Sequence, residues 1–505
     1  MLKGKQVTKK TKIKQSKERK KKMKKMKRII SLALVIAAPA GTGGCAGKKN
    51  VSENSGEVPT LVWYVPGNKQ VDMKLVMEEA NKIIEPKIGA KLDLQMIDDA
   101  AFSERMSMMM ASNTEFDLCF TGYINPYVSG VRMGGFAPMT ELMEKYTPEF
   151  LKTFPDYALK SARVDGDIYA VPNLQIMAQY SGVFVFDDYY EKYGFDKIEK
   201  IDDVRVLEPC FDKILKNEKN VYPVNGAIGN YSDVWIASST PLMCIKKNDP
   251  EMKVIWGADM DNAEESRKLT RDWYLKGYIR PDIDTCPSDS EELKAGRYVC
   301  FSGRYKPGIE EEYYIQYGRR VHFIPMGEPI IPQGCGVDTM TAISRTSKHK
   351  DKAMQFIELI NTDKDLYNLI CYGIKDKHYT LQEDGLHISP IENSGYSHLA
   401  AWKFGNQFNA YLLEGQADNT WEETKRLNET AEICPLLGLT FETDNIKSQL
   451  SQLKAANEEF VSMHKGAADY TVQFPEYRKK MEDAGIYDVI AEYQRQIDEF
   501  LKENK

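Results

Sequence analysis

Residues 60–121 alternate between strand-like and helix-like patterns, and this alternation restricts the fold more than any other feature of the sequence. Three short strand-like runs, at 60–65, 92–96 and 117–121, are separated by two stretches with apolar residues at helical spacing. Strand, helix, strand, helix and strand in so short a segment form a βαβαβ unit, whose strands are parallel. The sequence therefore predicts an α/β fold.

The rest of the chain predicts a second α/β section and a helical C-terminal region. Strand-like segments at 183–186, 300–302 and 321–325 alternate with helical segments, and two amphipathic helices follow residue 430. A chain of 505 residues is also too long for one ordinary domain, since domains commonly have about 100–200 residues. We therefore expect two or more lobes.

The N-terminal residues have the organisation of an export signal. Residues 1–28 carry a net charge of +14, and the uncharged apolar run Ile29–Ala40 is too short to span a bilayer comfortably. Small residues and then Cys45 follow, an order that resembles a bacterial lipoprotein signal in which the cysteine is diacylated. We predict a signal peptide at 1–44 and a lipidated Cys45 that begins a flexible tether at 45–59.

The basic segment before the apolar run is long for a signal peptide. We interpret it as an extension from a misassigned start, with Met23 or Met26 as the true initiator. The alternative is a basic arm that binds nucleic acid. Residues 45–505 have a net charge of −20, which disfavours nucleic-acid binding because phosphate contacts require clustered Lys and Arg. This charge suits a neutral or cationic small ligand.

Recognised catalytic and cofactor motifs are absent from the sequence. It contains no nucleophile elbow, Walker loop, HExxH or GxGxxG motif, and the six histidines have no metal-ligand spacing. Acidic residues also occur in pairs, such as Asp98–Asp99, Asp187–Asp188 and Glu310–Glu312. We interpret them as solvent-exposed surface residues rather than as the two catalytic carboxylates of a glycosidase. The eight cysteines after Cys45 are dispersed, which leaves disulfides and buried thiols both open. We expect no enzyme activity, no cofactor and no metal.

Aromatic and amide side chains recur where the predicted strands end. In open parallel sheets, ligands bind beyond the carboxyl ends of the strands, and sugars combine flat C–H faces with hydroxyl groups. The candidate ligand contacts are Trp63, Tyr64, Asn68, Tyr123, Asn125, Asn173, Gln175, Asp233, Trp235, Arg304, Asp338 and Trp402. Trp63, Tyr64 and Tyr123 are expected to stack on a ligand, and Trp235 and Trp402 to complete the platform. The other members of the set are expected to make polar contacts.

Several motifs in succession resemble the extracellular solute-binding proteins of ABC importers. These motifs are FSERMSMMMASNTEFDLCFTG at 102–122, GFAPMTEL at 135–142, DGDIYAVP at 165–172, the strand and helix at 336–363, and the region from Ala401 to Phe500. The last region resembles the C-terminal part of the LplA/LipO-like lipoproteins. The resemblance covers nearly all of residues 60–500.

The resemblance implies a two-lobed periplasmic-binding-protein-like fold of type II, with a hinge between the lobes. Lobe 1 would contain 60–168 and 345–425, and lobe 2 would contain 172–340 and the C-terminal helices at 430–505. The protein would be a monomer, anchored by lipid on the outer face of the cytoplasmic membrane. It would capture a small solute, with an oligosaccharide favoured, and deliver it to the permease subunits of an ABC transporter.

Two other functions stay open at the level of sequence. One is an exported carbohydrate-active enzyme, which needs two convergent carboxylates in the cleft. The other is a peptide-binding or sensory lipoprotein. For the preferred function, we expect Trp63→Ala to weaken ligand binding at least about tenfold without unfolding the protein.

Overall fold

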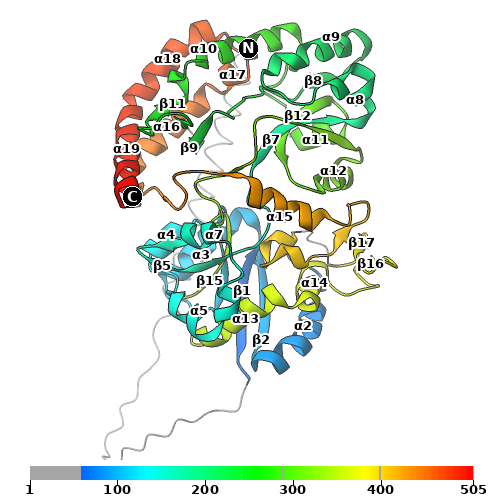
Figure 1. Cartoon of the computed structure of the whole chain (residues 1–505), viewed down its shortest axis with the longest axis vertical. Coiled ribbons are helices and arrows are strands. Elements are labelled where there is room, and N and C mark those ends of the chain that lie inside the picture. Colours follow the sequence, from blue (N-terminus) through cyan, green and yellow to red (C-terminus); the bar gives the residue numbers. More distant parts are fainter. Residues whose placement is uncertain (1–57, 240, 287–288, 397–399, 504–505) are drawn as a thin grey trace, which may run out of the picture. The chain divides into compact units, whose positions relative to one another are not determined.

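The computed structural model describes residues 58–239, 241–286, 289–396 and 400–503 (Figure 1). The predicted signal peptide and Cys45 lie outside the described residues. Within these ranges, no helix has the length and apolar character needed to cross a membrane.

The first sheet has five strands in the spatial order β2-β1-β3-β15-β6. Their bounds are β1 (Thr60–Pro66), β2 (Lys91–Ile97), β3 (Leu118–Gly122), β6 (Ala170–Pro172) and β15 (Thr339–Ile343). β1 is parallel to β2 and β3, as the βαβαβ pattern predicts. β15 arrives from a distant part of the chain and runs antiparallel to β3 and β6, so the complete sheet is mixed.

Amphipathic helices pack on this sheet because each has one apolar face. Helix α2 (Met73–Ile88), for example, buries Val76, Ala80 and Ile84 and ends at Gly89, whose φ is 64°. The other helices of this group are α3 (Asp99–Ala111), α4 (Tyr127–Arg132), α5 (Thr140–Tyr146), α6 (Pro148–Leu151), α7 (Asp156–Ser161), α13 (Lys350–Thr362), α14 (Lys364–Tyr372) and α15 (Thr420–Thr430). Its small strands are β4 (Arg163–Val164), β5 (Asp167–Ile168), β16 (Tyr379–Leu381), β17 (His387–Pro390) and β18 (Leu412–Leu413).

The second sheet has four strands in the order β13-β7-β12-β8. Their bounds are β7 (Tyr180–Phe186), β8 (Tyr222–Val224), β12 (Tyr298–Tyr305) and β13 (Val321–Pro325). The accompanying helices are α8 (Asp187–Tyr193), α9 (Glu208–Asn217), α10 (Ala263–Lys276), α11 (Asp289–Lys294) and α12 (Ile309–Tyr317). This is the predicted second α/β section, and β7 and β12 are both longer than their apolar runs indicated.

A third hydrophobic core joins a small antiparallel sheet to the C-terminal helices. The sheet contains β9 (Val234–Ser239), β10 (Leu242–Lys246) and β11 (Val254–Trp256). The helices are α16 (Lys447–Glu459), α17 (Val461–His464), α18 (Tyr470–Asp483) and α19 (Ile486–Glu503), drawn in orange and red in Figure 1. The helix expected to run from Ile446 to His464 is interrupted at Phe460, which separates α16 from α17.

Three chain segments lie side by side where the chain passes between the first sheet and the other two. Gln179 and Ile330 exchange backbone hydrogen bonds of 2.7 and 3.0 Å. β14 (Ile330–Ile331) also pairs in parallel with β19 (Glu432–Ile433). We refer to residues 58–178 and 331–433 as lobe 1, and to the other described residues as lobe 2.

The crossings between the lobes differ from the expected boundaries. β6 reaches Pro172 within the first sheet, and β15 returns to that sheet at Thr339, which the sequence placed in lobe 2. Short strands carry little sequence signal of their own. Their membership of a sheet is decided by the partner strand, which here is remote in sequence.

Candidate ligand-binding site

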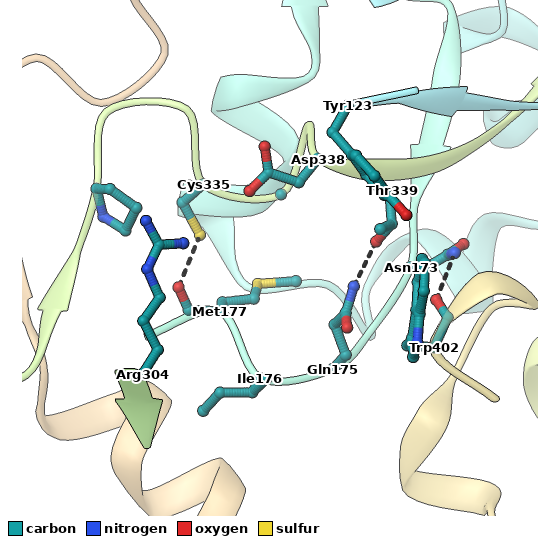
Figure 2. Close-up of a pocket in the computed structure, with 12 residues that line it drawn as sticks. Tyr123, Asn173, Gln175, Ile176, Met177, Arg304, Cys335, Asp338, Thr339 and Trp402 are labelled. Carbon is teal, nitrogen blue, oxygen red and sulfur yellow. Dashed lines mark hydrogen bonds between the residues drawn. The ribbon is translucent and has the colours of Figure 1, made fainter. Parts of the chain in front are cut away.

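A cavity of about 460 Å³ lies at the carboxyl end of β3, beside the crossing segments (Figure 2). This volume is within the range of roughly 300–1,000 Å³ that is usual for small-ligand sites. Its lining residues are Tyr123, Asn173, Gln175, Ile176, Met177, Arg304, Pro332, Cys335, Gly336, Asp338, Thr339 and Trp402. Lobe 1 supplies all of them except Arg304, which stands on β12 of lobe 2.

The end of β3 places Tyr123 at the cavity. Gly122 has a φ of 140°, and a Cβ atom there would stand 1.9 Å from the carbonyl oxygen of Asp338, so only glycine fits. Asn125 is buried, and its side-chain amide donates to the carbonyl of Phe120 at 3.2 Å. The turn is therefore fixed from both sides, while the Tyr123 side chain stays 56% exposed.

Tyr123 and Trp402 form an aromatic surface on one side of the cavity. Their ring centroids are 5.9 Å apart at an angle of 45°, and the Trp402 ring also contacts the edge of Phe120. The adjacent Lys403 is buried and donates from Nζ to the carbonyl of Pro66 at 2.9 Å, which ties this segment to β1. Burial lowers the pKa of Lys403, and nearby Asp99 opposes the shift.

Hydrogen bonds from the amides of Asn173 and Gln175 fix the polar groups next to this aromatic surface. The backbone N–H of Asn173 donates to the carbonyl of Thr339 at 2.9 Å, which extends the ladder between β6 and β15. Its side-chain amide donates to the carbonyl of Trp402 at 2.9 Å. The amide of Gln175 donates to the hydroxyl of Thr339 (Figure 2). Asn173 therefore orients the Trp402 segment as well as lining the cavity.

Arg304 and Asp338 are the charged groups of the lining. Figure 2 shows Arg304 extending from β12 on the side of the cavity away from Trp402. Among the described residues, neither side chain has a direct hydrogen bond or ion pair, and both are exposed. Desolvation by the surrounding protein raises the pKa of Asp338, and the charge of Arg304 opposes that shift. Both groups are free to bind a polar ligand.

The remaining wall of the cavity is apolar. Ile176, Met177 and Pro332 lie there, together with Cys335, whose thiol is 3.8 Å from the carbonyl oxygen of Met177. Burial raises the pKa of Cys335 to about 12, so the thiol is neutral at physiological pH. The cavity thus combines an aromatic side, amide and charged groups, and an apolar side.

Comparison with known proteins places this geometry among solute-binding proteins. A carbohydrate ABC transporter substrate-binding protein of Streptococcus pneumoniae is 28% identical over 488 residues, with 94% of this chain and 98% of that protein covered. The crystal structure of the N-glycan transport solute binding protein of the same organism is 26% identical and has a TM-score of 0.78. That match covers 88% of this chain and 100% of the other. Over nearly its whole length, the chain is similar to extracellular solute-binding proteins of ABC importers.

Two further findings refine this assignment. The complex of the N-glycan transport solute binding protein with Man1GlcNAc matches at 27% identity and a TM-score of 0.71, again over 88% of this chain and all of that one. Residues 435–502 match a domain of unknown function, DUF3502. This domain includes α16–α19, the helical region expected at the C-terminus.

Six of the twelve candidate contacts predicted from the sequence line the cavity. They are Tyr123, Asn173, Gln175, Arg304, Asp338 and Trp402. Four others lie elsewhere: Tyr64 packs on Phe116, Asn68 and Asp233 are exposed outside the lining, and Trp235 is buried in the third core. Asn125, described above, supports Tyr123 without lining the cavity.

The interpretation of Trp63 as a stacking residue requires correction. Its side chain is fully buried in the core of lobe 1, where its ring meets Phe356 at 5.4 Å and Phe404 at 5.6 Å. Trp63 lies in the middle of β1, and the alternation of the strand directs it inward. The expected result of Trp63→Ala therefore changes from a loss of binding to a loss of stability.

Sequence reasoning missed the apolar wall of the cavity. Ile176 and Met177 follow β6 without a regular pattern, and Pro332 and Cys335 belong to the segment that returns from lobe 2. Apolar side chains of this kind cannot be distinguished from core residues by spacing. The only local sequence feature that pointed to this part of the lining was the position of Gly336 and Thr339 close to the predicted contact Asp338.

The lining of the cavity contains few groups that could act as acids, bases or metal ligands. It contains one carboxylate, Asp338, whereas glycoside hydrolysis normally needs two. Within the described residues, no group of three or more His, Cys, Asp or Glu side chains could hold a metal ion. All eight described cysteines are free thiols.

Proposed function

We propose that the protein captures an oligosaccharide in the cavity between its lobes and delivers it to the permease of an ABC importer. The observation that carries this proposal is the composition of the cavity: the rings of Tyr123 and Trp402 beside the amides of Asn173 and Gln175. Aromatic faces can stack on the C–H face of a sugar, and the amides and Arg304 can hydrogen-bond its hydroxyl groups.

The relatives support a carbohydrate as the ligand and suggest which one to test first. The N-glycan transport solute binding protein has been crystallised with Man1GlcNAc and with Man5GlcNAc. The apolar wall formed by Ile176, Met177 and Pro332 suits the methyl group of an N-acetyl substituent, which needs a surface without hydroxyl partners. We therefore favour a ligand that contains an N-acetylhexosamine.

The present conformation fits an open, ligand-free form. The TM-score is 0.78 against the N-glycan transport solute binding protein described without a glycan, and 0.71 and 0.68 against its two glycan complexes. A solute that contacts both lobes stabilises the closed form, because those contacts are complete only there. Arg304 is the lobe 2 group that is already at the cavity.

Calorimetric titration of the protein with Man1GlcNAc, Man5GlcNAc, maltose and a mixed peptide library tests this function. We expect saturable binding of at least one glycan and no binding of peptides. Binding of peptides alone would favour the peptide-binding or sensory alternative. Release of monosaccharides during the titration would favour the enzyme, which the single lining carboxylate argues against.

We also propose that lipid on Cys45 anchors a monomeric protein to the outer face of the membrane. The support is the order of basic residues, the apolar run Ile29–Ala40 and Cys45. In cells, Cys45→Ala should abolish incorporation of labelled palmitate and release the protein from the membrane fraction. Retention of both lipid and membrane association in this variant would contradict the anchor.

A further inference from the structure

Lobe 2 contains a second cavity, of about 640 Å³, that has no part in the proposed capture of the solute. One face of α10 lies along it, loops 202–205 and 227–231 form one wall, and α16–α18 form another. The second wall belongs to the region that matches DUF3502. Several segments that are distant in the sequence therefore meet around this space.

Arg267 on α10 is the distinctive group of the second cavity. Its guanidinium stacks on the ring of Phe474 at 3.7 Å, and its Nε is buried without a hydrogen-bond partner among the described residues. Arg267 lines the cavity, and no described group accepts a hydrogen bond from its terminal nitrogens. Glu264 attracts Arg267 only through space, and burial lowers the pKa of Arg267. A half-buried guanidinium without a carboxylate is costly unless a ligand supplies the acceptor.

The charged groups around Arg267 are already paired or are not part of the lining. Arg478 also lies over Phe474, at 5.5 Å, and is paired with Asp259. His464 lines the cavity, and burial and then Arg267 lower its pKa. The carboxylates of the lining are those of Asp202, Asp203 and Glu265. Arg205 binds both Asp203 and Glu265, so these two do not pair with Arg267.

Aromatic rings form the remaining walls of this cavity. Trp256 and Tyr477 are buried, and their rings lie 5.8 Å apart. Tyr231, in the loop at 227–231, also lines the cavity and is 44% exposed. Rings on two sides suit the C–H face of a small cyclic or aromatic body. The guanidinium fork of Arg267 suits a planar carboxylate.

We propose that the second cavity binds a small carboxylate attached to a ring or other C–H-rich body, with Arg267 as the carboxylate ligand and Tyr231 as a stacking residue. Acidic sugars and the C-terminus of an aromatic peptide share this chemistry. The DUF3502 helices would then supply one wall of a binding site separate from the solute cavity.

Titration calorimetry with N-acetylneuraminate, D-glucuronate and N-acetyl-L-phenylalanine tests the proposal and separates the two sources. We expect saturable binding of at least one probe, weakened at least tenfold by Arg267→Gln. Arg478→Gln is the matched control, because it removes a charge beside the same Phe474 ring but not from the lining, and its effect should stay below threefold. Tyr231→Ala should also weaken binding. This second variant keeps the test valid even if the Arg267 variant fails to fold.

The proposal is overturned if none of the three probes binds, or if inorganic phosphate binds as tightly as the carboxylates. It is also overturned if Tyr231→Ala and Arg267→Gln both leave binding unchanged. Glycan binding by Trp402→Ala and by Arg267→Gln is measured in parallel. If only the Trp402 variant loses glycan binding, the two cavities bind independently. A failure of the second-cavity proposal then does not count against the proposed capture of a glycan.

Discussion

Lobe 1 and lobe 2 contribute very unequally to the solute cavity. Lobe 1 presents its groups already ordered: Asn173 is 2% exposed and hydrogen-bonds to the Trp402 segment, and the Gly122 turn fixes Tyr123. Lobe 2 presents Arg304, an exposed side chain without a direct partner among the described residues. This difference is what we expect if lobe 1 is a preformed binding surface and lobe 2 completes the site on closure.

The largest expected effect is on stability, and it distinguishes a core tryptophan of lobe 1 from a tryptophan that lines the cavity. Trp63→Ala should lower the free energy of unfolding by about 3–5 kcal/mol, because it leaves a cavity between Phe356 and Phe404. Trp402→Ala, at a half-buried site, should cost much less stability. Urea denaturation followed by circular dichroism compares the two. Equal loss in both variants would mean that Trp402 is also a core residue.

The second effect concerns the preformed surface itself. Trp402→Ala should weaken glycan binding by about tenfold or more, since it removes one of the two rings expected to stack on the sugar. Calorimetry with Man1GlcNAc measures it. Trp421→Ala is the matched control, because this half-buried tryptophan packs on Phe408 in the same lobe without lining the cavity. The same affinity for both variants would remove Trp402 from the site.

A smaller effect is expected for lobe 2. Arg304→Ala should weaken glycan binding about three- to tenfold, mainly through faster dissociation, because Arg304 contacts the ligand after the lobe 1 surface has engaged it. Stopped-flow fluorescence measures the two rate constants. Arg297→Ala changes another arginine of lobe 2 that does not line the cavity, and it should leave both rates unchanged. A slower association with unchanged dissociation would contradict the proposed order.

The smallest effect follows from the raised pKa of Asp338. At pH 7 the carboxylate is ionised in both the folded and unfolded chains, and desolvation penalises only the folded one. Asp338→Asn should therefore raise Tm slightly at pH 7. The difference from the parent protein should shrink as pH falls through the folded pKa toward the unfolded value, because the acid is then neutral in both states. Thermal scans from pH 7 to pH 3.5 check this, and a difference that grows toward acid pH would contradict it.

The asymmetry between the lobes also explains what the sequence could predict. The βαβαβ pattern of β1, β2 and β3 is local, and the position of Tyr123 after β3 follows from it. The membership of β15 in the first sheet depends on pairing over more than 200 residues, which no local pattern encodes. Trp63 was assigned to the ligand site because it is an aromatic residue that could stack on a sugar. Its position in the middle of β1, which directs the side chain into the core, was not taken into account.

The apolar wall and the second cavity could not have been predicted. Both arise where segments distant in sequence meet, as Met177 meets Cys335 and Arg267 meets Phe474. Their side chains are ordinary apolar, aromatic or basic residues in amphipathic or irregular segments. Only the folded arrangement shows that Arg267 lacks a carboxylate partner among the described residues.

Closure of the lobes around a glycan is the central claim, and the distance across the solute cavity tests it most directly. Spin labels on cysteines introduced at the exposed residues Glu141 in lobe 1 and Lys216 in lobe 2, with Cys45 and Cys286 replaced by serine, report this distance by double electron–electron resonance. Saturating Man5GlcNAc should shift the distribution to shorter distances, and Trp402→Ala should prevent the shift at the same glycan concentration. An unchanged distribution in a protein shown by calorimetry to be fully occupied would contradict capture by closure.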